Sequence, residues 1–269
     1  MPSRIQSLPV NDPILQAQFR ETLLRLDPRY SDPKRLYKFA YKVYSQDDTD
    51  GSIAEIFRRI GTDRRNFIEI GVENGLECNT LHLLMQGWSG HWIDSDEKSM
   101  SQIQGKFGMY LGSTLHTRHQ LVSAENANTL LSRLCPDGVL DLLSIDIDGN
   151  DYWVWNAISS VHPRVVMMEY NATWRPPLSV TIEYNPRHKW DGTNYFGASL
   201  SALASLAEKK GYSLVGCSFA GVNAYFVRND LCGGHFAAPF TAENHYEPPR
   251  YWMIGPAGHP PGFGRLSSV

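Results

Sequence analysis

Acidic side chains stand at the ends of several short apolar segments in this 269-residue sequence. Each segment has the length and apolar composition of a strand in a buried parallel sheet. Because the carboxyl ends of parallel strands meet at one edge of the sheet, we expect these acids to share one cleft. The acids are Glu69, Asp146, Asp148 and Glu169. Repulsion among them must be relieved by a cation, a proton or a positively charged ligand, unless they are solvated loop acids.

The first of these segments continues into a glycine turn and then a helical pattern. Residues 67–70 form the apolar run, and apolar residues recur at helical spacing over 76–86. Between them, Gly71 and Gly75 allow a tight turn and a close approach of the backbone to a ligand. A strand, glycine turn and helix in this order place a nucleotide-like ligand at the carboxyl edge of a parallel sheet. A purely structural glycine turn is the alternative.

The residues of the turn indicate the type of ligand. A dinucleotide site needs the spacing G-x-G-x-x-G, which is absent, and Glu69 and Glu73 would repel a pyrophosphate. Acids suit a ligand that carries an amine or a sulfonium, such as S-adenosylmethionine. The turn resembles motif I of class I methyltransferases, E-x-G-x-G-x-G, with Glu73 in place of the middle glycine. We therefore predict cofactor contacts at Glu69, Gly71, Asn74 and Gly75.

The next apolar segment, residues 90–93, ends at Asp94. An acid at the end of strand 2 accepts hydrogen bonds from ribose hydroxyls in nucleoside-binding α/β folds. We assign this role to Asp94, with Ser95 as a further cofactor contact and Asp96 as the fallback acid. A helix amino cap at Asp94 is the alternative.

A third strand is expected over residues 119–122, followed by a turn that begins a helix. Glu125 and Asn126 in that turn are candidates to flank an adenine ring. A simple capping turn led by Ser123 is an equal alternative.

The remaining patterns predict the elements that must position these residues. Helical spacing is found over residues 12–26, 32–44, 53–60, 96–106, 149–158 and 198–210, with Asp50 or Ser52 as the cap of the third helix. Further strands are expected over residues 139–148, 164–171, 212–216 and 223–228. Asp146 and Asp148 point the same way if their strand stays extended.

The last two strands form an antiparallel hairpin, which is the ending of class I methyltransferases. A dinucleotide-binding Rossmann domain would add a parallel strand instead. We predict an α/β fold with a Rossmann-like class I methyltransferase sheet, strand order 3-2-1-4-5-7-6, strand 7 antiparallel. Residues 1–60 would form a helical amino-terminal cap and 61–230 the main domain. Residues 231–269 would form an irregular tail that wraps the surface or supports a homo-oligomer contact.

A long polar and aromatic segment, residues 172–197, interrupts the main domain. Long loops in compact domains are usually functional or disordered, and this one is too aromatic for simple disorder. We expect a lid over the cleft that binds a polyhydroxylated substrate. The candidate substrate contacts are Tyr170, Asn171, Trp174, Arg187, Trp190 and Tyr195. His188 is the candidate catalytic histidine, with a surface-loop histidine as the alternative.

Composition excludes several classes of function. A net charge of -3 gives no electrostatic case for nucleic acid or an anionic membrane. No apolar run is long enough to span a bilayer, and the amino terminus lacks the apolar core of a signal peptide. The cysteines form no C-x-x-C pair and suggest reduced thiols in a cytoplasmic protein.

Several of these stretches together resemble the FkbM-type methyltransferase family, over about residues 44–228. They are residues 44–51, 69–75, the strand leading to Asp94, 145–149 and 165–169. The resemblance implies an S-adenosylmethionine-dependent O-methyltransferase, of a family that often acts on sugars or natural products. It also implies cofactor contacts at Gln46 and Asp146.

A second resemblance concerns a metal ion. Residues 147–152 are similar to the I-D-G-D-L-Y segment of metal-dependent macrolide-sugar O-methyltransferases. This implies Asp148 and Glu169 as magnesium ligands. Those enzymes carry paired aspartates after strand 5, where this chain has Glu169-Tyr170-Asn171, so Asn171 is the third candidate ligand.

The resulting hypothesis is methyl transfer to a hydroxyl group held near Asp148 and Glu169. Either a divalent cation or a direct base, with His188 the most suitable histidine, would activate the hydroxyl. A catalytically silent binding or scaffold subunit is one alternative. A nicotinamide-dependent oxidoreductase is another, which the turn spacing and the terminal hairpin disfavour. Sugar, polyketide, peptide and small phenol all remain open as acceptors.

Overall fold

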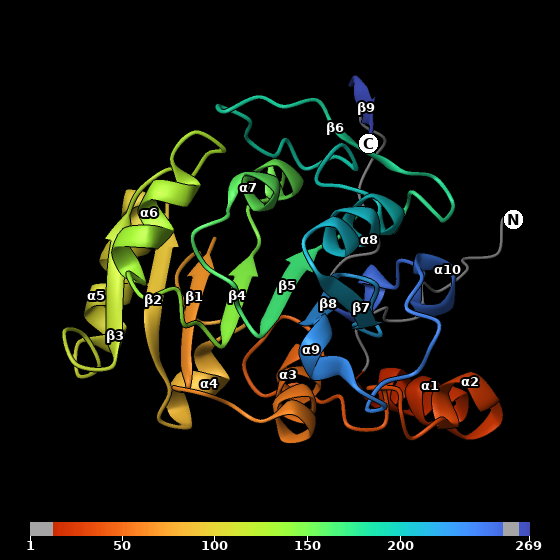
Figure 1. Cartoon of the computed structure of the whole chain (residues 1–269). Helices are drawn as coiled ribbons and strands as arrows, with labels where there is room; N and C mark the ends of the chain where they lie inside the picture. Colours follow the sequence, from red (N-terminus) through yellow and green to blue (C-terminus); the bar gives the residue numbers. More distant parts are fainter. Residues whose placement is uncertain (1–12, 255–263) are drawn as a thin grey trace, which may run out of the picture.

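A seven-stranded sheet forms the centre of the computed structural model, which describes residues 13–254 and 264–269. The strand order is β3-β2-β1-β4-β5-β8-β7 (Figure 1). Neighbouring strands are parallel from β3 to β5, and β8 is antiparallel to both β5 and β7. Apart from the small extra strand β6, this confirms the predicted class I methyltransferase sheet. The strands are β1 Asn66–Ile70, β2 Ser89–Asp94, β3 Leu115–His119, β4 Leu142–Ile145, β5 Val165–Glu169, β7 Tyr212–Cys217 and β8 Asn223–Arg228.

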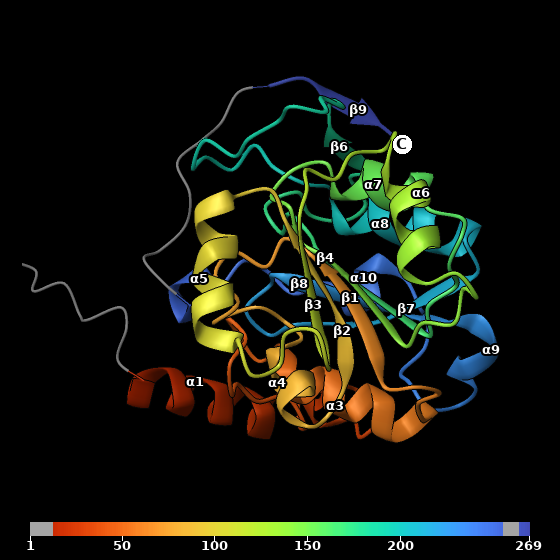
Figure 2. The same cartoon turned by 90° about the vertical axis from the view of Figure 1, so that its left-hand side faces the viewer.

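Helices cover both faces of this sheet (Figure 2). One core cluster joins the sheet to α6 Ala127–Leu134, α7 Asp151–Ala157 and α8 Leu200–Lys209. The other joins it to α3 Thr49–Ile60, α4 Leu81–Met85 and α5 Glu97–Phe107. Alternate residues of a strand face opposite layers, so Ile68 packs in the first cluster and Phe67 in the second. Burial on both faces explains why the central strands are almost continuously apolar.

The outer elements lie at the two ends of the chain. They are α1 Pro13–Leu26, α2 Pro28–Ser31, α9 Asn229–Cys232, α10 Ala242–His245 and a 3₁₀ turn over Tyr251–Met253. A second, two-stranded sheet pairs β6 Val180–Ile182 with β9 Leu266–Ser268. This pair lies beyond the carboxyl ends of the main strands, where the lid was expected (Figure 1). Among the helices of the described residues, none is long and apolar enough to cross a membrane.

The helix predicted over residues 32–44 is wrong, because this segment forms turns. Asp50 accounts for the last residues of this segment. One of its carboxylate oxygens accepts hydrogen bonds from the backbone N–H groups of Val43, Tyr44 and Ser45 at 2.7–2.9 Å. These N–H groups are therefore not available for a helical ladder. The predicted cap of the next helix is also wrong, since Asp48 occupies that position and makes no side-chain capping bond.

Two further boundaries differ from the prediction. The helix expected over residues 76–86 begins only at Leu81, because Glu69 binds the backbone N–H groups of Asn79 and Thr80 just before it. The third strand covers residues 115–119 and not 119–122. It is an edge strand with polar, exposed residues such as His116 and Arg118, so its sequence lacks the apolar run that marks the other strands.

A buried glutamate joins the two ends of the chain. Glu247 is 0% exposed, and its oxygens accept hydrogen bonds from Arg29, Tyr30, Tyr37 and Arg250 at 2.7–2.8 Å. Removing one partner of such a buried charged network typically costs about 3–5 kcal/mol. The carboxyl-terminal segment is thereby fixed against the segment that follows α1.

His245, in the same carboxyl-terminal segment, predicts a pH-dependent stability. Burial lowers the pKa of His245 to about 3, assisted by the charges of Arg35 and Arg29 and opposed by its hydrogen bond to the Ala237 carbonyl. Between about pH 6.5 and 3 the unfolded chain binds more protons at this residue than the folded chain does. The contribution of neutral His245 is therefore complete above about pH 6.5 and decreases as the pH falls.

We expect the stability advantage of the wild type over His245→Gln to shrink as the pH falls from 7 to 4.5. The slope should approach about 1.4 kcal/mol per pH unit, because the glutamine cannot take up a proton. Urea unfolding of both proteins at several pH values measures it. An advantage that stays constant over this range contradicts the prediction.

Candidate active site

A cavity of about 1030 Å³ lies at the carboxyl ends of the sheet strands. The segments that follow β1, β2, β3 and β4 line it, together with Glu169 of β5 and Asn223 of β8. Its other sides are closed by residues 42–44, Gln46, residues of the lid, Tyr251 and Ile254. Sites for one small molecule usually enclose about 300–1,000 Å³. The volume of this cavity is at the upper end of that range.

The glycine turn forms one wall of the cavity. Gly71 has φ +84°, and a Cβ atom there would lie 1.6 Å from the backbone oxygen of Asp146. The turn thus approaches the end of β4 too closely for any side chain. Glu73, at the position of the missing middle glycine, also has a left-handed backbone, with φ 48°. Gly75 does not line the cavity and packs against the rings of Trp92 and Phe107.

Glu69 lies behind this turn and does not line the cavity. It is 0% exposed, and its oxygens accept hydrogen bonds from the backbone N–H groups of Asn79 and Thr80 at 2.8 and 3.0 Å. The hydroxyl groups of Thr80 and Ser144 complete its surroundings. Burial raises the pKa of Glu69, and these hydrogen bonds oppose the effect. Glu69 therefore shapes the turn, whereas the sequence suggested direct contact with a ligand.

Asp94 and Ser95 both line the cavity. One oxygen of Asp94 accepts hydrogen bonds from the backbone N–H groups of Val72 and Glu73 at 2.9 and 2.8 Å. The other accepts from the N–H of Asp96. Asp96 is the amino cap of α5, and its side chain accepts a hydrogen bond from the backbone N–H of Ser99. Helix capping, the alternative role considered for Asp94, is therefore performed by Asp96. A carboxylate has about four lone-pair positions, so Asp94 keeps capacity for a ligand.

The wall after β3 is made by Gln120, Leu121 and Val122. Glu125 and Asn126, the predicted adenine contacts, do not line the cavity. Glu125 accepts a hydrogen bond from the Tyr184 hydroxyl, and Asn126 binds the backbone at both ends of its own turn. Sequence reasoning missed residues 120–122 because it placed β3 four residues too late. The general rule that ligands contact the residues after each strand would have found them.

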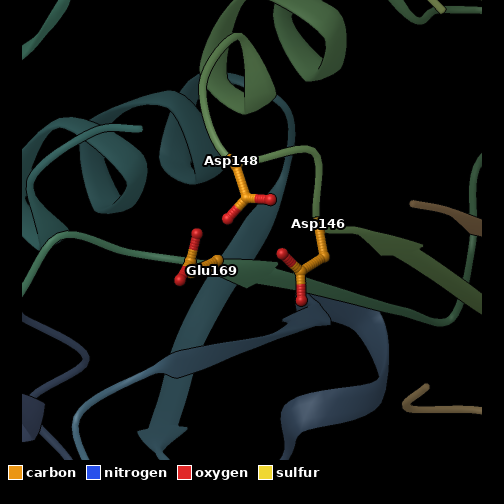
Figure 3. A group of neighbouring side chains, drawn as sticks. All are labelled: Asp146, Asp148 and Glu169. Carbon is orange, nitrogen blue, oxygen red and sulfur yellow. The ribbon is translucent and has the colours of Figure 1, made fainter. Parts of the chain in front are cut away.

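Asp146, Asp148 and Glu169 come together at the ends of β4 and β5, as predicted. One oxygen from each lies within 4.8 Å of the others, and Figure 3 shows the carboxylates of Asp146 and Asp148 pointing toward Glu169. The strand does not stay extended between the two aspartates, because β4 ends at Ile145 and Asp148 has φ 53°. Asp151 stabilises this turn by accepting hydrogen bonds from two of its backbone N–H groups.

The electrostatics of this acid cluster are unfavourable without a partner. Burial, followed by the negative charges of Asp151, Glu73 and Asp94, raises the pKa of Asp148 to about 6. Burial and the neighbouring acids also raise the pKa values of Asp146 and Glu169. Glu169 Oε2 is buried and has no hydrogen-bond partner among the described residues. The cluster thus has the oxygen ligands and the unmatched charge that suit a hard divalent cation.

His188, from the lid, also lines the cavity. It packs directly over Gly149, where a Cβ atom would lie 2.3 Å from the His188 ring. The ring's Nε2 has no partner among the described residues. Burial lowers the pKa of His188, which favours the neutral imidazole, and the nearby backbone of Asp148 opposes this shift. A neutral ring with a free nitrogen beside the acid cluster can accept a proton.

The structure separates the other predicted substrate contacts. Trp190 lines the cavity, while Tyr170, Asn171, Trp174, Arg187 and Tyr195 do not. Gln46, predicted as a cofactor contact, also lines it. The buried Tyr170 hydroxyl donates to the Glu247 carbonyl, and the Tyr195 hydroxyl donates to the Arg265 carbonyl. Asn171 is wrong as a metal ligand. Its Nδ2 donates to the lid carbonyls of Asn194 and Phe196 and its Oδ1 accepts from Thr173, so its amide holds the lid.

Comparisons with known proteins give similarity in fold alone. No protein-family model matches the sequence, and a search of curated proteins finds no match. Solved structures that resemble the chain include the N-terminal domain of EvdMO1 with SAH bound, at 12% identity and a TM-score of 0.45, covering 79% of this chain and 94% of that one. Another is the magnesium protoporphyrin IX methyltransferase (ChlM) from Synechocystis PCC 6803 with bound SAH. Its identity is 12% and its TM-score 0.45, and the match covers 81% of this chain and 100% of that one.

A third is the glycopeptide N-methyltransferase MtfA complexed with S-adenosylmethionine, at 12% identity and a TM-score of 0.43, covering 70% and 96%. Likeness at this level carries no argument about activity. The assignment of the fold rests on the strand order and directions described above.

The close contact at Gly71 can be tested against a matched glycine. Gly87 has a similar φ of +83°, but no atom lies within 4 Å of the position of its Cβ. We expect Gly87→Ala to cost about 1–2 kcal/mol, the strain of a left-handed alanine. Gly71→Ala should cost a further ~1–3 kcal/mol or more, because the Asp146 backbone must move. Chemical unfolding of both variants measures the difference, and equal costs would contradict the close approach.

Proposed function

We propose that this chain is an S-adenosylmethionine-dependent O-methyltransferase that acts on a hydroxyl group of a small molecule, such as a sugar, a glycan or a natural product. One observation carries the proposal. The glycine turn held by Asp94 lines the same cavity as the acid cluster and His188. A site for a nucleoside-like cofactor and a site for proton transfer are thus adjacent.

The structure also gives a reason against a dinucleotide. In dinucleotide-binding folds the pyrophosphate sits on free N–H groups at the start of the helix after the first strand. Here the N–H groups just before α4 donate to the buried carboxylate of Glu69. In addition, Glu73, Asp94 and the three acids of the cluster line the cavity. A ligand with a sulfonium and an ammonium group is attracted to such a site, whereas a pyrophosphate is repelled.

The cofactor would occupy the side of the cavity next to β1 and β2. Asp94 is placed to accept hydrogen bonds from the ribose hydroxyls, with Ser95 beside it. Leu121 and Val122 offer an apolar wall for the adenine. Gln46, Gly71 and Asn74 line the part of the cavity left for the methionyl group. Glu69 supports this arrangement from behind the turn.

The acceptor would occupy the side next to β4 and β5. S-Adenosylmethionine supplies the methyl group, which leaves sulfur for the acceptor oxygen and yields S-adenosylhomocysteine and one proton. His188 Nε2 is the group that would take this proton. Asp146, Asp148 and Glu169 would hold a magnesium ion, which lowers the pKa of a hydroxyl bound beside it. The His188 ring meanwhile packs directly over Gly149, next to this cluster.

The rim of the cavity indicates an acceptor with an apolar body. Exposed apolar side chains surround the mouth: Val43, Tyr44, Leu76, Leu121 and Trp190. The floor, in contrast, contains the carboxylates. A molecule with a hydroxylated end and an apolar remainder matches both surfaces. The FkbM-type resemblance, with its sugars and natural products, is consistent with such an acceptor and remains part of the proposal.

Binding of S-adenosylhomocysteine tests the cofactor directly. We expect calorimetry to show saturable binding with about one site per chain. Asp94→Asn should weaken it about 10- to 100-fold, because a hydrogen bond to a charged group contributes about 1.5–3 kcal/mol. Glu125→Gln is the matched control, since Glu125 does not line the cavity, and should bind like the wild type. The absence of binding at millimolar ligand would contradict the proposal and favour a silent scaffold subunit or another cofactor.

Replacement of His188 tests the proton acceptor. With a hydroxylated acceptor that supports turnover, we expect His188→Gln to lower kcat about 10²- to 10⁴-fold and to leave S-adenosylhomocysteine binding unchanged. His162→Gln is the control, because His162 is exposed and lies outside the cavity. A kcat close to that of the wild type would remove His188 from the mechanism and leave a carboxylate as the base.

A further inference from the structure

Asn223 is the neighbour of Glu169 in the sheet. It is the first residue of β8, and its Cα pairs with that of Glu169 in the antiparallel register of β5 and β8. Paired residues on antiparallel strands carry their side chains on the same face, about 4.5–5.5 Å apart at Cβ. Both residues line the cavity, and Asn223 is only 2% exposed. The acid cluster therefore has an amide side chain beside it.

The hydrogen bonds of Asn223 fix which end of its amide is free. Its Nδ2 donates to Thr49 Oγ1 at 3.1 Å and to Asn79 Oδ1 at 3.4 Å. The hydroxyl of Thr49 donates its own hydrogen to Asp47 at 2.5 Å, so Thr49 Oγ1 can only accept from Asn223. If the amide were turned around, its oxygen would face Thr49 Oγ1, which has no hydrogen left to donate. Asn223 Oδ1 therefore points away from this network.

That oxygen has no hydrogen-bond partner among the described residues, and it is buried. A buried carbonyl without a partner costs about 1–3 kcal/mol. Glu169 Oε2 is likewise buried and has no hydrogen-bond partner among the described residues. Two residues paired across β5 and β8 thus each have a buried oxygen without a donor, and one of them belongs to the acid cluster, so a cation at the cluster would satisfy both.

We propose that Asn223 Oδ1 is a fourth oxygen ligand of the divalent-cation site formed by Asp146, Asp148 and Glu169. The inference rests on the metal-ion part of the proposed function. Amide carbonyls and carboxylates together are the ligands that hard cations such as Mg²⁺ and Mn²⁺ prefer. Asn223 takes the place that the sequence suggested for Asn171, whose amide holds the lid. Three adjacent strands, β4, β5 and β8, would then contribute to one site.

Binding of Mn²⁺ to the full chain, followed by electron paramagnetic resonance or calorimetry without an acceptor, tests this inference. We expect one site in the wild type and an affinity about 10- to 100-fold lower in Asn223→Ala, the range typical when a group that supports a metal site is removed. Asn223→Asp keeps an oxygen at this position and should bind Mn²⁺ at least as tightly as the wild type. Asn229→Ala is the control, because Asn229 is exposed, lies just beyond the far end of β8 and does not line the cavity, and it should keep the wild-type affinity.

The two replacements of Asn223 separate a ligand from a structural residue. Both remove the hydrogen bonds that Nδ2 makes to Thr49 and Asn79, but only alanine removes the oxygen. Equal weakening in the two variants would therefore overturn the inference, as would an unchanged affinity in Asn223→Ala. If the alanine variant does not fold, the aspartate variant still decides, because weaker Mn²⁺ binding there contradicts a ligand role.

Failure of the metal site and failure of the methyltransferase proposal give different results. A wild type that binds S-adenosylhomocysteine but no Mn²⁺ would overturn the cation site, and with it the role of Asn223, while the cofactor assignment stands. A wild type that binds Mn²⁺ but no S-adenosylhomocysteine would contradict the proposed function and leave an oxygen-ligand metal site to explain.

Discussion

The carboxylate of Glu69 is buried beneath the glycine turn, where two backbone N–H groups and two hydroxyl groups surround it. It determines where α4 begins, and it occupies the N–H groups that would otherwise bind an anion. Asp94 binds the same turn from the cavity side, through the N–H groups of Val72 and Glu73. Asp94 thus fixes the start of the loop between β1 and α4, and Glu69 fixes its end. Gly71 meets the backbone at the end of β4.

The cavity also concentrates negative charge. Several carboxylates line one cavity, and no lysine or arginine pairs with Asp146, Asp148 or Glu169 among the described residues. Other buried acids are compensated, Glu247 by Arg29 and Arg250 and Glu69 by backbone N–H and hydroxyl donors. Since an unpaired buried charge is costly, the difference indicates that the charge in the cavity serves a ligand.

Segments distant in sequence complete the cavity. Residues 42–44 and Gln46 line it because Asp50 holds their backbone in a turn, and Tyr251 and Ile254 line it because Glu247 fixes the preceding chain. The lid is held by the amide of Asn171 and by the pairing of β6 with β9, and Asn150 and Trp153 donate hydrogen bonds to its carbonyls. A separate amino-terminal or carboxyl-terminal segment would therefore not carry the site. The pocket depends on contacts that cross the whole chain.

The sequence by itself determined most strand positions along the chain, the glycine turn, Asp94 and the acids at the ends of β4 and β5, whereas the order of the strands in the sheet was predicted from the resemblance to class I methyltransferases. The strand positions and the acids follow from local periodicity and from the rule that parallel strands end at one edge. Only the tertiary structure decided that Glu69 faces the interior, that residues 32–44 form turns, and that Asn223 rather than Asn171 lies beside Glu169. The reason is that each of these outcomes depends on a hydrogen-bond or strand partner remote along the chain, and local spacing does not specify which remote groups meet.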